Sequence, residues 1–372
     1  MKTRHLIYVL LSVCFLCACT NDDLNIPEIN EQKTEVKEEV SLKQAKDLLE
    51  AFVGETYSRS ANSFKIKSHR IRTVHVNNIG GLPSKAKETI PVYEFVTETD
   101  GKEGYSVVVS DERVDKVLIS VPYGSLADTT FIEPLRLYYQ DIPLLIEQDL
   151  EQYNKGTQET TTQSRMTVEN VYRFLPTIWG QGYPYNAQCP NLYPAGCVAI
   201  GVAQILAYHR LPSSLNWNSI LASSSVTTSS ASAVIDQVST LIHNVGVSLN
   251  TQYTAQESTA FLSAVPSVLI SYGLQNWGVM NFSIENGKYS LQNGGPFILF
   301  ANHSDGNVGH VWVCDGWKRH IYDDNTYYDY LNMNWGWGGI SNGFYYVENP
   351  MSFSAGGYMF NRNFLMIYNI RK

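Results

Sequence analysis

The sequence predicts an α+β protein with two folded regions, and the order of its patterns along the chain carries the prediction. Residues 41–153 open on a helical pattern, continue through four strand-like runs and end on a second helical pattern. Residues 168–372 show helical patterns first and strand patterns afterwards. Helices and antiparallel strands that are segregated along the chain are typical of the α+β class. A chain of 372 residues, 44% of them hydrophobic, is long enough for two domains.

The first region is predicted to be a small α+β unit. Apolar residues recur at helical spacing over 41–54, where Ser41 and Gln44 match a capping box and Gly54 is placed to end the helix. Asp100-Gly101 is a hairpin signal between two alternating runs. Strands are expected at residues 65–76, 91–98, 105–110 and 115–124, and a second helix at residues 134–153.

The second region follows a Thr- and Gln-rich stretch, residues 154–167, which contains Lys155 and Arg165. This stretch has no apolar periodicity, so we expect an exposed linker that a protease can cut. Beyond it, Pro266 is placed to kink or split a helix. Helices are expected at residues 196–210, 231–245 and 257–272, and strands at residues 296–300, 309–317, 327–335, 343–347 and 363–369.

The N-terminus has the pattern of an export signal. Lys2 and Arg4 precede an apolar run that is too short to span a bilayer comfortably. The run ends in Leu-Cys-Ala-Cys, which resembles a bacterial lipobox with cleavage before Cys19 and a lipid on its thiol. We therefore expect a signal peptide at residues 1–18, a flexible tether at residues 19–40 and a lipoprotein of the bacterial cell envelope, at the outer membrane or the cell surface. A plain signal peptide is the alternative.

Composition argues against some classes of function, and the cysteine count indicates a free thiol. A net charge of −8 argues against a nucleic-acid binder, which normally has a basic face. Neither metal-ligand spacing nor a phosphate-binding glycine motif occurs in the mature region, so we expect no metal and no cofactor. Of the six cysteines, three fall within residues 168–372, namely Cys189, Cys197 and Cys314. Three cysteines cannot all pair within one chain, which indicates a free thiol.

Cys197 is the candidate nucleophile. It lies where the loop containing Pro194 and Gly196 meets an apolar helical pattern. A helix N-terminus lowers the pKa of a thiol, so a cysteine at this position can be reactive. It can equally be a small core residue, which is the more common role of a free cysteine.

A cysteine nucleophile needs a histidine as its base, and His310 is the best placed. It begins a strand-like run directly after a glycine-rich loop, and alternation places Trp312 and Cys314 on its side of the strand. His303, within the loop, is a weaker rival. His209 lies too far along the helix from Cys197 to reach it. The alternative for His310 is a histidine packed at the end of a strand.

Two further segments offer supporting groups. In residues 332–339, Asn334 can accept a hydrogen bond from the imidazole, and Trp335 and Trp337 can shield it; an aromatic hairpin turn is the alternative. In residues 179–186, the Gln181 amide can join the Cys197 backbone N–H in an oxyanion hole. A solvated loop glutamine is the alternative there.

These segments in this order resemble the streptopain family of papain-like cysteine peptidases, over roughly residues 166–372. The resemblance rests on WGQGYPYN, PAGCVAIGVAQILAYHR, GGPFILF, GHVWVCDGW and NWGWGG. It implies a papain-like peptidase domain at residues 168–372 and, on weaker grounds, a propeptide at residues 41–153. It also implies site residues: Cys197 as nucleophile, His310 as general base and acid, Gln181 in the oxyanion hole, Asn334 and Trp335 as the orienting wall, and Gly196, Gly309 and Trp337 along the substrate cleft.

The resemblance predicts a secreted or surface-anchored endopeptidase made as a zymogen. Its partners would be protein or peptide substrates, its own propeptide and, through the lipid on Cys19, a membrane. The segment SFSAGGYMF has only a short glycine pair where streptopain has a longer glycine-rich loop, so substrate preference stays open. A peptide-binding lipoprotein without catalysis and an acyl transferase of the transpeptidase kind are the alternatives.

Overall fold

The computed structural model describes residues 31–57, 63–76, 88–128, 133–154, 167–171, 174–302, 309–321, 327–347, 354–355, 358–359 and 364–372. The expected signal peptide, the lipidated Cys19 and His303 lie outside the described residues, as does the linker 154–167 except for its two end positions. The chain forms two compact units, residues 1–39 and residues 40–372. The second unit contains both predicted regions.

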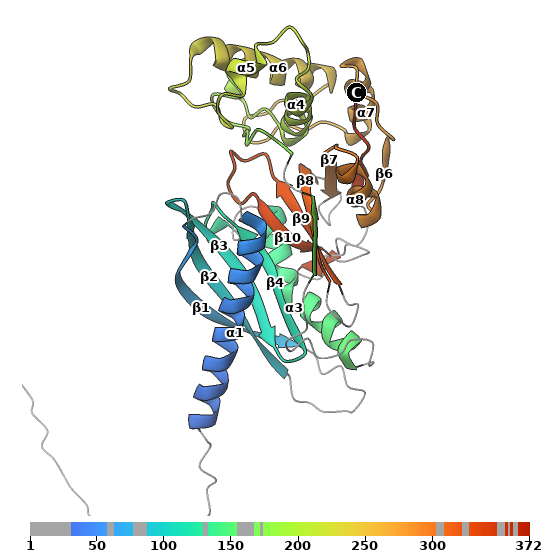
Figure 1. Ribbon diagram of the computed structural model, residues 1–372. Coiled ribbons are helices and arrows are strands. Elements are labelled where there is room, and N and C mark those ends of the chain that lie inside the picture. The colour runs from blue at the N-terminus through green and yellow to red at the C-terminus, as the bar shows by residue number, and fades with distance from the viewer. Residues whose placement is uncertain are drawn as a thin grey trace, which may run out of the picture. The chain divides into compact units, whose positions relative to one another are not determined.

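A single antiparallel sheet of 11 strands runs through both regions (Figure 1). Its strands are β1 (Lys65–Val76), β2 (Glu88–Thr99), β3 (Lys102–Asp111), β4 (Val114–Val121), β5 (Thr167–Val171), β6 (Val279–Asn281), β7 (Phe297–Asn302), β8 (Gly309–Ile321), β9 (Tyr327–Asn334), β10 (Gly343–Val347) and β13 (Leu365–Ile367). Their order is β1-β2-β3-β4-β10-β9-β8-β7-β13-β6, and β5 pairs with β8. A separate pair consists of β11 (Ser354–Ala355) and β12 (Tyr358–Met359). The β4–β10 pair joins the two regions.

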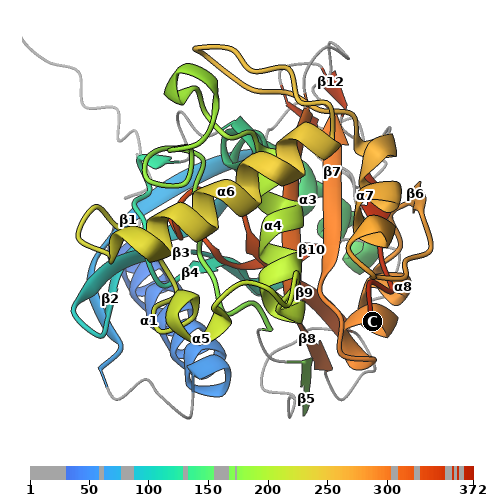
Figure 2. The same cartoon turned by 90° about the horizontal axis from the view of Figure 1, so that it is seen from above.

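The helices gather around this sheet. They are α1 (Glu31–Tyr57), α3 (Glu133–Asn154), α4 (Cys197–His209), α5 (Trp217–Ile220), α6 (Ser232–Ser248), α7 (Val265–Ser271) and α8 (Ile284–Gln292), with 3-10 turns at Pro190–Leu192 and Leu262–Ala264. Figure 2 shows α6 crossing α4, and α4 packs against β8. Among the described residues, no helix combines the length and the apolar composition needed to cross a bilayer. Helices and antiparallel strands in this arrangement confirm the predicted α+β class.

The predicted start and end of the first helix are wrong. Because α1 begins before Ser41 and continues past Gly54, neither residue caps it. The Ser41 hydroxyl donates to the Ser110 carbonyl at 2.8 Å, and the Gln44 amide donates to the Asp115 carboxylate at 3.2 Å. The two polar side chains that match a capping box thus bind the sheet. The expected tether, residues 19–40, overlaps the start of α1.

The helix predicted at residues 257–272 is wrong over its first half. Gln252 and Thr259 form an isolated antiparallel bridge, and helical structure begins only at the 3-10 turn that precedes α7. Pro266 lies in the first turn of α7, where its missing N–H leaves no helical hydrogen bond unmade. Pro266 therefore starts a helix instead of kinking one. The hairpin expected at Asp100-Gly101 is confirmed, with φ of 52° and 76° at the two turn positions.

Alternation along β8 divides the core into two clusters, as predicted. Trp312 and Cys314 are buried in the cluster that also contains the side chains of the N-terminal region. Val311 and Val313 face the other cluster, which α4 and α6 cover. Because period-2 alternation sends neighbouring side chains to opposite faces, one strand serves both cores. The N-terminal region thus shares a core with one face of β8.

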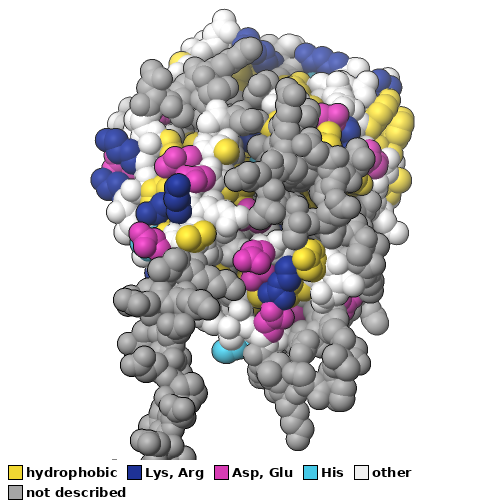
Figure 3. All heavy atoms as spheres, turned by 60° about the horizontal axis from the view of Figure 1, so that its bottom comes forward, with side chains coloured by type: hydrophobic (Ala, Val, Ile, Leu, Met, Phe, Trp, Pro, Cys, Tyr) yellow, Lys and Arg dark blue, Asp and Glu magenta, His cyan; other side chains and the backbone are white. Residues whose placement is uncertain are grey.

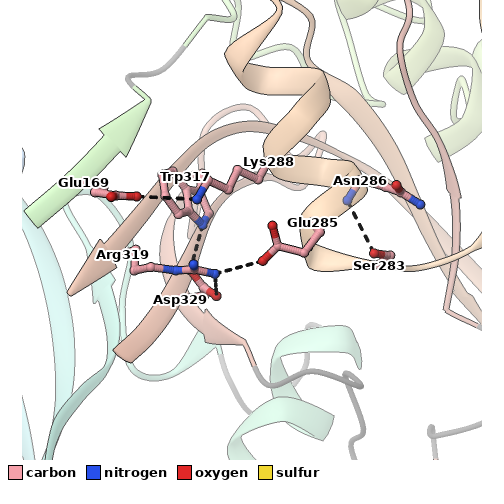
Figure 4. Close-up of polar contacts among 8 residues, drawn as sticks. All are labelled: Glu169, Ser283, Glu285, Asn286, Lys288, Trp317, Arg319 and Asp329. Carbon is pink, nitrogen blue, oxygen red and sulfur yellow. Dashed lines mark hydrogen bonds and ion pairs between the residues drawn. The ribbon is translucent and has the colours of Figure 1, made fainter. Parts of the chain in front are cut away.

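Charged side chains link α8 to the sheet (Figure 4). The Arg319 guanidinium contacts both carboxylate oxygens of Asp329, at 2.8 and 2.7 Å, and reaches Glu285 on α8 at 3.1 Å. The Trp317 indole donates to the same Asp329 at 2.8 Å. Planar two-point pairing of this kind holds both partners in one geometry. On the face shown in Figure 3, the visible acidic and basic side chains lie in small mixed groups.

Candidate active site

Cys197 is the first residue of α4 and is half-buried. The residue before it, Gly196, caps the helix with φ of 89°, a conformation that side chains other than glycine rarely adopt. A Cβ on Gly196 would also lie 2.8 Å from the Ser258 carbonyl oxygen. Backbone strain and crowding therefore both require glycine directly before the thiol.

A close approach joins α4, which begins at Cys197, to the part of β8 that follows His310. Gly201, one helical turn after Cys197, faces the strand, and a Cβ there would lie 3.2 Å from Val311 Cγ1. Pairing of β8 with β9 begins only at Val313, so the Val311 N–H does not bond to β9. That N–H opposes the rise in the pKa of the Cys197 thiol. The thiol is thus influenced by the backbone of the residue that follows the predicted base.

The imidazole of His310 has a defined orientation. Its Nε2 lies 3.0 Å from the backbone carbonyl oxygen of Trp335. A carbonyl oxygen only accepts, so Nε2 carries the proton in the neutral ring. The lone pair is then on Nδ1, which is free to exchange a proton with a thiol. This assignment follows from the hydrogen bond, as it does for histidines oriented by a backbone carbonyl in other sites.

Three tryptophans enclose the imidazole. The Trp337 ring stacks on His310 with centroids 4.7 Å apart and planes at 25°. Trp335 stacks on Trp337 at 5.5 Å and 9°, and Trp312 lies 5.0 Å from Trp335. Apolar rings exclude water from one side of the imidazole, which strengthens the hydrogen bonds made there. The sequence predicted this enclosure from Trp335 and Trp337.

Asn334 does not make the expected bond to the imidazole. Its side-chain oxygen accepts from the Gln204 amide and from the Gly336 N–H, each at 3.2 Å. Its side-chain nitrogen donates to the Thr177 carbonyl at 2.9 Å. Asn334 is the last residue of β9, and its side chain points toward α4. The backbone carbonyl of the next residue, Trp335, faces the imidazole instead. Asn334 acts on the imidazole only through the backbone that it holds.

Gln204 is the residue that the sequence reading missed. It is fully buried on α4, and its carbonyl oxygen accepts from the Thr177 hydroxyl at 3.1 Å and from the Trp179 N–H at 3.0 Å. Through these two hydrogen bonds and its pairing with the Asn334 side chain, Gln204 links α4 to β9 and to the loop before Gln181. One signal was present: Gln204 is the single polar side chain in an otherwise apolar helical run, Val198–Ala207. A fully buried amide requires partners, and these determine its position.

Gln181 lies next to the start of α4. Its backbone carbonyl accepts from the Ala195 N–H at 2.9 Å, which fixes the loop two residues before Cys197. Its half-buried side-chain amide has no hydrogen-bond partner among the described residues, so its two N–H donors are available to another group. Gly309, the other predicted cleft residue, pairs with Asn302 and packs on the Phe300 ring. Close packing against β7 explains why position 309 is a glycine.

Burial keeps both reactive groups neutral in this form of the protein. Burial raises the pKa of the Cys197 thiol, and Glu257 adds to the increase, while the Val311 N–H opposes it. Burial lowers the pKa of His310 to about 4, against the opposing effect of the Trp335 carbonyl. At pH 7 the pair is therefore thiol and neutral imidazole. An ion pair needs a less buried arrangement.

The other two thiols are structural. Cys314 is fully buried on β8, as predicted, and burial raises its pKa well above 9.0. Cys189, which the sequence left unplaced, is buried beside Tyr253, and burial raises its pKa as well. All three cysteines of the described chain are free. Of the three, only Cys197 is partly exposed.

The sequence matches a described peptidase family. Residues 179–215 and 211–345 match the model of the peptidase C10 family. Streptopain of Streptococcus pyogenes serotype M1 is 25% identical over an alignment of 372 residues, which covers 85% of this chain and 87% of streptopain. Thiol protease/hemagglutinin PrtT of Porphyromonas gingivalis is 24% identical over 73% of this chain, and the match spans only 36% of the PrtT length.

A solved structure of active wild-type interpain A cysteine protease from Prevotella intermedia is 23% identical, with a TM-score of 0.41, over 53% of this chain and 94% of that one. The matched residues include both Cys197 and His310. Over residues 179–345, the chain matches the C10 (streptopain) family of cysteine peptidases, and it is homologous to streptopain.

Proposed function

We propose that the chain is the precursor of an endopeptidase that hydrolyses peptide bonds in proteins, with Cys197 as nucleophile and His310 as general base and acid. One observation carries the proposal: α4, which begins at Cys197, packs closely on Val311, and the residue before Val311 is a histidine whose Nε2 lies 3.0 Å from the Trp335 carbonyl. The other ring nitrogen, Nδ1, is then free to exchange a proton with the Cys197 thiol.

The catalytic steps follow from these positions. The Cys197 proton moves to His310 Nδ1, and the thiolate attacks the peptide carbonyl carbon. The developing oxyanion takes hydrogen bonds from the Cys197 N–H and the Gln181 amide. His310 returns its proton to the leaving amine, which departs as the C–N bond breaks. His310 next takes a proton from water, and the hydroxide attacks the thioester carbon. The C–S bond breaks, the acid product leaves, and His310 returns the proton to the Cys197 sulfur.

We propose that residues 41–153 are the propeptide of this precursor. β4 pairs with β10, with Ser120 opposite Phe344 and Ile119 opposite Tyr345. The Tyr138 hydroxyl lies 3.0 Å from the carbonyls of both Leu118 and Tyr346, on either side of that junction. Backbone pairing and a shared core support a tight association that cutting the linker 154–167 would not by itself dissolve.

Two buried lysines support the same association. Lys116 of β4 pairs with Asp149 at 2.6 Å and lies 4.0 and 4.1 Å from the ring centroids of Tyr328 and Tyr346 in the peptidase part. In the opposite direction, Lys318 of β8 donates a hydrogen bond to the backbone carbonyl of Phe52 in α1, at 3.1 Å. Each part thus buries a lysine against the other. Such buried charges are destabilising once separated from their partners.

We propose that latency comes from the neutral state of the catalytic pair. The thiol and the imidazole are both kept uncharged by burial in the form that includes residues 41–153. A thiolate is the reactive species, so this form is expected to alkylate slowly at pH 7. After the linker is cut and the propeptide leaves, the pair becomes more solvated and the ion pair forms.

The anchor and the location rest on sequence alone. We propose a lipid on Cys19 and residence at the bacterial outer membrane or cell surface, from which the processed peptidase is released. The run before Cys19 and the polar residues after it support this assignment. Metabolic labelling with a palmitate analogue tests it: wild type takes up the label, and Cys19→Ala does not.

The proposed function is tested by a time course on purified residues 20–372, wild type beside Cys197→Ala, followed by gel and intact mass. Wild type is expected to shorten to a fragment that begins near residue 166, while the variant stays full length. Gln181→Ala is expected to lower kcat about 10²–10³-fold. If wild type, after added trypsin, neither cleaves casein nor takes a thiol-reactive active-site probe, the non-catalytic binding protein is the better reading. Ligated instead of hydrolysed products would indicate an acyl transferase.

A further inference from the structure

A short hairpin lies against the nucleophile and belongs to none of the predicted catalytic segments. Gln252 and Thr259 exchange two backbone hydrogen bonds, of 2.8 and 3.1 Å, which close residues 252–259. Within it, the Thr254 hydroxyl accepts from the Glu257 N–H at 3.1 Å and donates to the Glu257 carbonyl. The backbone on both sides of Glu257 is therefore fixed by local bonds.

The hairpin is in direct contact with the residue before the thiol. The Ser258 carbonyl lies so close to Gly196 that a Cβ there would be 2.8 Å away, and Ser258 itself is 2% exposed. Glu257 precedes this buried contact and is exposed. Because Ser258 is held in place by burial, the position from which the neighbouring Glu257 side chain extends into solvent is also defined.

The Glu257 residue lies near the start of α4, because the next residue, Ser258, packs on Gly196. Among the described charged side chains, it is the one that adds to the rise in the pKa of the Cys197 thiol. Among the described residues, Glu257 forms no ion pair, so its charge is uncompensated in the protein by itself. An uncompensated exposed carboxylate beside a nucleophile has two effects: it attracts cations, and it disfavours the thiolate.

We infer that Glu257 determines specificity, by selecting substrates that carry a lysine or arginine side chain next to the scissile bond. The inference rests on the proposed endopeptidase function. A bound substrate cation beside Glu257 neutralises the carboxylate and removes its effect on Cys197. A basic substrate is then both held more tightly and attacked by a thiol that ionises more readily. Neither gain is available to a neutral or acidic substrate.

The test uses the processed enzyme and a casein-derived peptide that the wild type cuts. A single lysine is moved through each position from the third residue before the scissile bond to the third residue after it, with glutamine and glutamate peptides in parallel. At one position, wild type is expected to prefer lysine to glutamine about 2- to 5-fold in kcat/KM, which is within the range for an exposed charge pair. The ratio should fall toward 1 in E257Q and favour glutamate in E257K.

The matched control is Glu285→Gln, which removes an exposed carboxylate of α8 paired with Arg319 instead of one near Cys197. It should keep the wild-type ratio. The ratio in wild type should also shrink as salt rises from 0.05 to 0.5 M, because exposed charges are screened. An unchanged lysine preference in E257Q, or no preference at any position in an active wild type, overturns the assignment of Glu257 alone. A wild type that cuts none of the peptides overturns the proposed function as well.

Discussion

The backbone carbonyl of Trp335 holds the imidazole of His310 at 3.0 Å, although Asn334 is the more obvious partner in the sequence. The same residue is tied on its other side, because the Trp335 indole N–H donates to the Ser341 carbonyl at 3.0 Å. Ser341 is in turn bonded to the N-terminal region through Tyr123 and Asp128. A short chain of hydrogen bonds therefore connects the proposed propeptide to His310.

Cys197→Ala is expected to abolish turnover while the free energy of unfolding changes by about 1 kcal/mol or less, because the side chain is small and half-buried. Initial rates on casein and urea unfolding measure the two effects. Cys189→Ala is the matched control: it removes another thiol from the same part of the fold and should stay active. Equal loss of activity in the two variants would remove Cys197 from its assigned role.

Gly201→Val is expected to reduce kcat/KM by at least about tenfold, because α4 must move away from β8. A Cβ already lies 3.2 Å from Val311 Cγ1, and further methyl groups overpack the contact at a cost of about 1–3 kcal/mol. A displaced Cys197 no longer faces His310 correctly. Gly201→Ala, which adds a single methyl group at the same contact, should reduce kcat/KM less than Gly201→Val. Full activity in Gly201→Val would show that the α4–β8 distance is unimportant.

Gln204→Leu is expected to lower the free energy of unfolding by about 2–4 kcal/mol, since it leaves the Trp179 N–H and the Thr177 hydroxyl buried without their acceptor. Urea unfolding in the Cys197→Ala background measures this without self-cleavage. Combining it with Asn334→Leu gives a double-mutant cycle. A coupling energy of about 0.5–3 kcal/mol is expected for residues in one network. Strictly additive effects would contradict the network.

Ser341→Ala is expected to loosen the proposed propeptide and leave catalysis unchanged. Its hydroxyl donates to Asp128 at 3.0 Å and lies 3.3 Å from the Tyr105 hydroxyl, while the bond to Trp335 uses the backbone and survives. The precursor in the Cys197→Ala background is nicked with trypsin and passed over a sizing column. The N-terminal fragment should co-elute with the peptidase when Ser341 is present and separate from it in the variant. Co-elution in both would assign the association to the β4–β10 pair alone.

His320 is expected to make the precursor less stable in acid. Its ring is buried between Phe52 and Tyr330, and burial, with a smaller effect of the Lys318 charge, lowers its pKa to about 3. The unfolded chain takes up a proton near the ordinary histidine pKa of 6.5, and the folded chain does so only near 3. Stability from His320 is therefore complete above about pH 6.5 and is lost as pH falls toward 3, by about 2–4 kcal/mol.

His320→Asn removes this titration, so the gap in unfolding free energy between wild type and variant should narrow as the pH falls from 6.5 to 3. Urea titrations across that range measure it in the Cys197→Ala background. Asp141 titrates with the opposite sign, because burial raises its pKa to about 8, and it is common to both proteins, so it cancels in the difference. A gap that does not vary with pH would contradict a neutral His320.

Strand positions were largely predictable, because alternation along a strand is local. The runs predicted at 65–76 and 343–347 match β1 and β10 residue for residue. Helix boundaries were less predictable. Ser41 and Gln44 match a capping box, yet their side chains bind Ser110 and Asp115, which are far away in the chain. A cap and a tertiary contact use the same polar residues, and local sequence does not distinguish them.

By itself, the sequence determined the α+β class, the placement of Cys197 at the start of a helix and of His310 at the start of a strand, and the family resemblance. These depend on residue type and local spacing. The tertiary structure decided which atoms meet: that Trp335, through its backbone, holds the imidazole, that Gln204 joins α4 to β9, and that β4 continues the peptidase sheet at β10. Backbone carbonyls and N–H groups are the same at every residue, so no sequence pattern marks the ones that act.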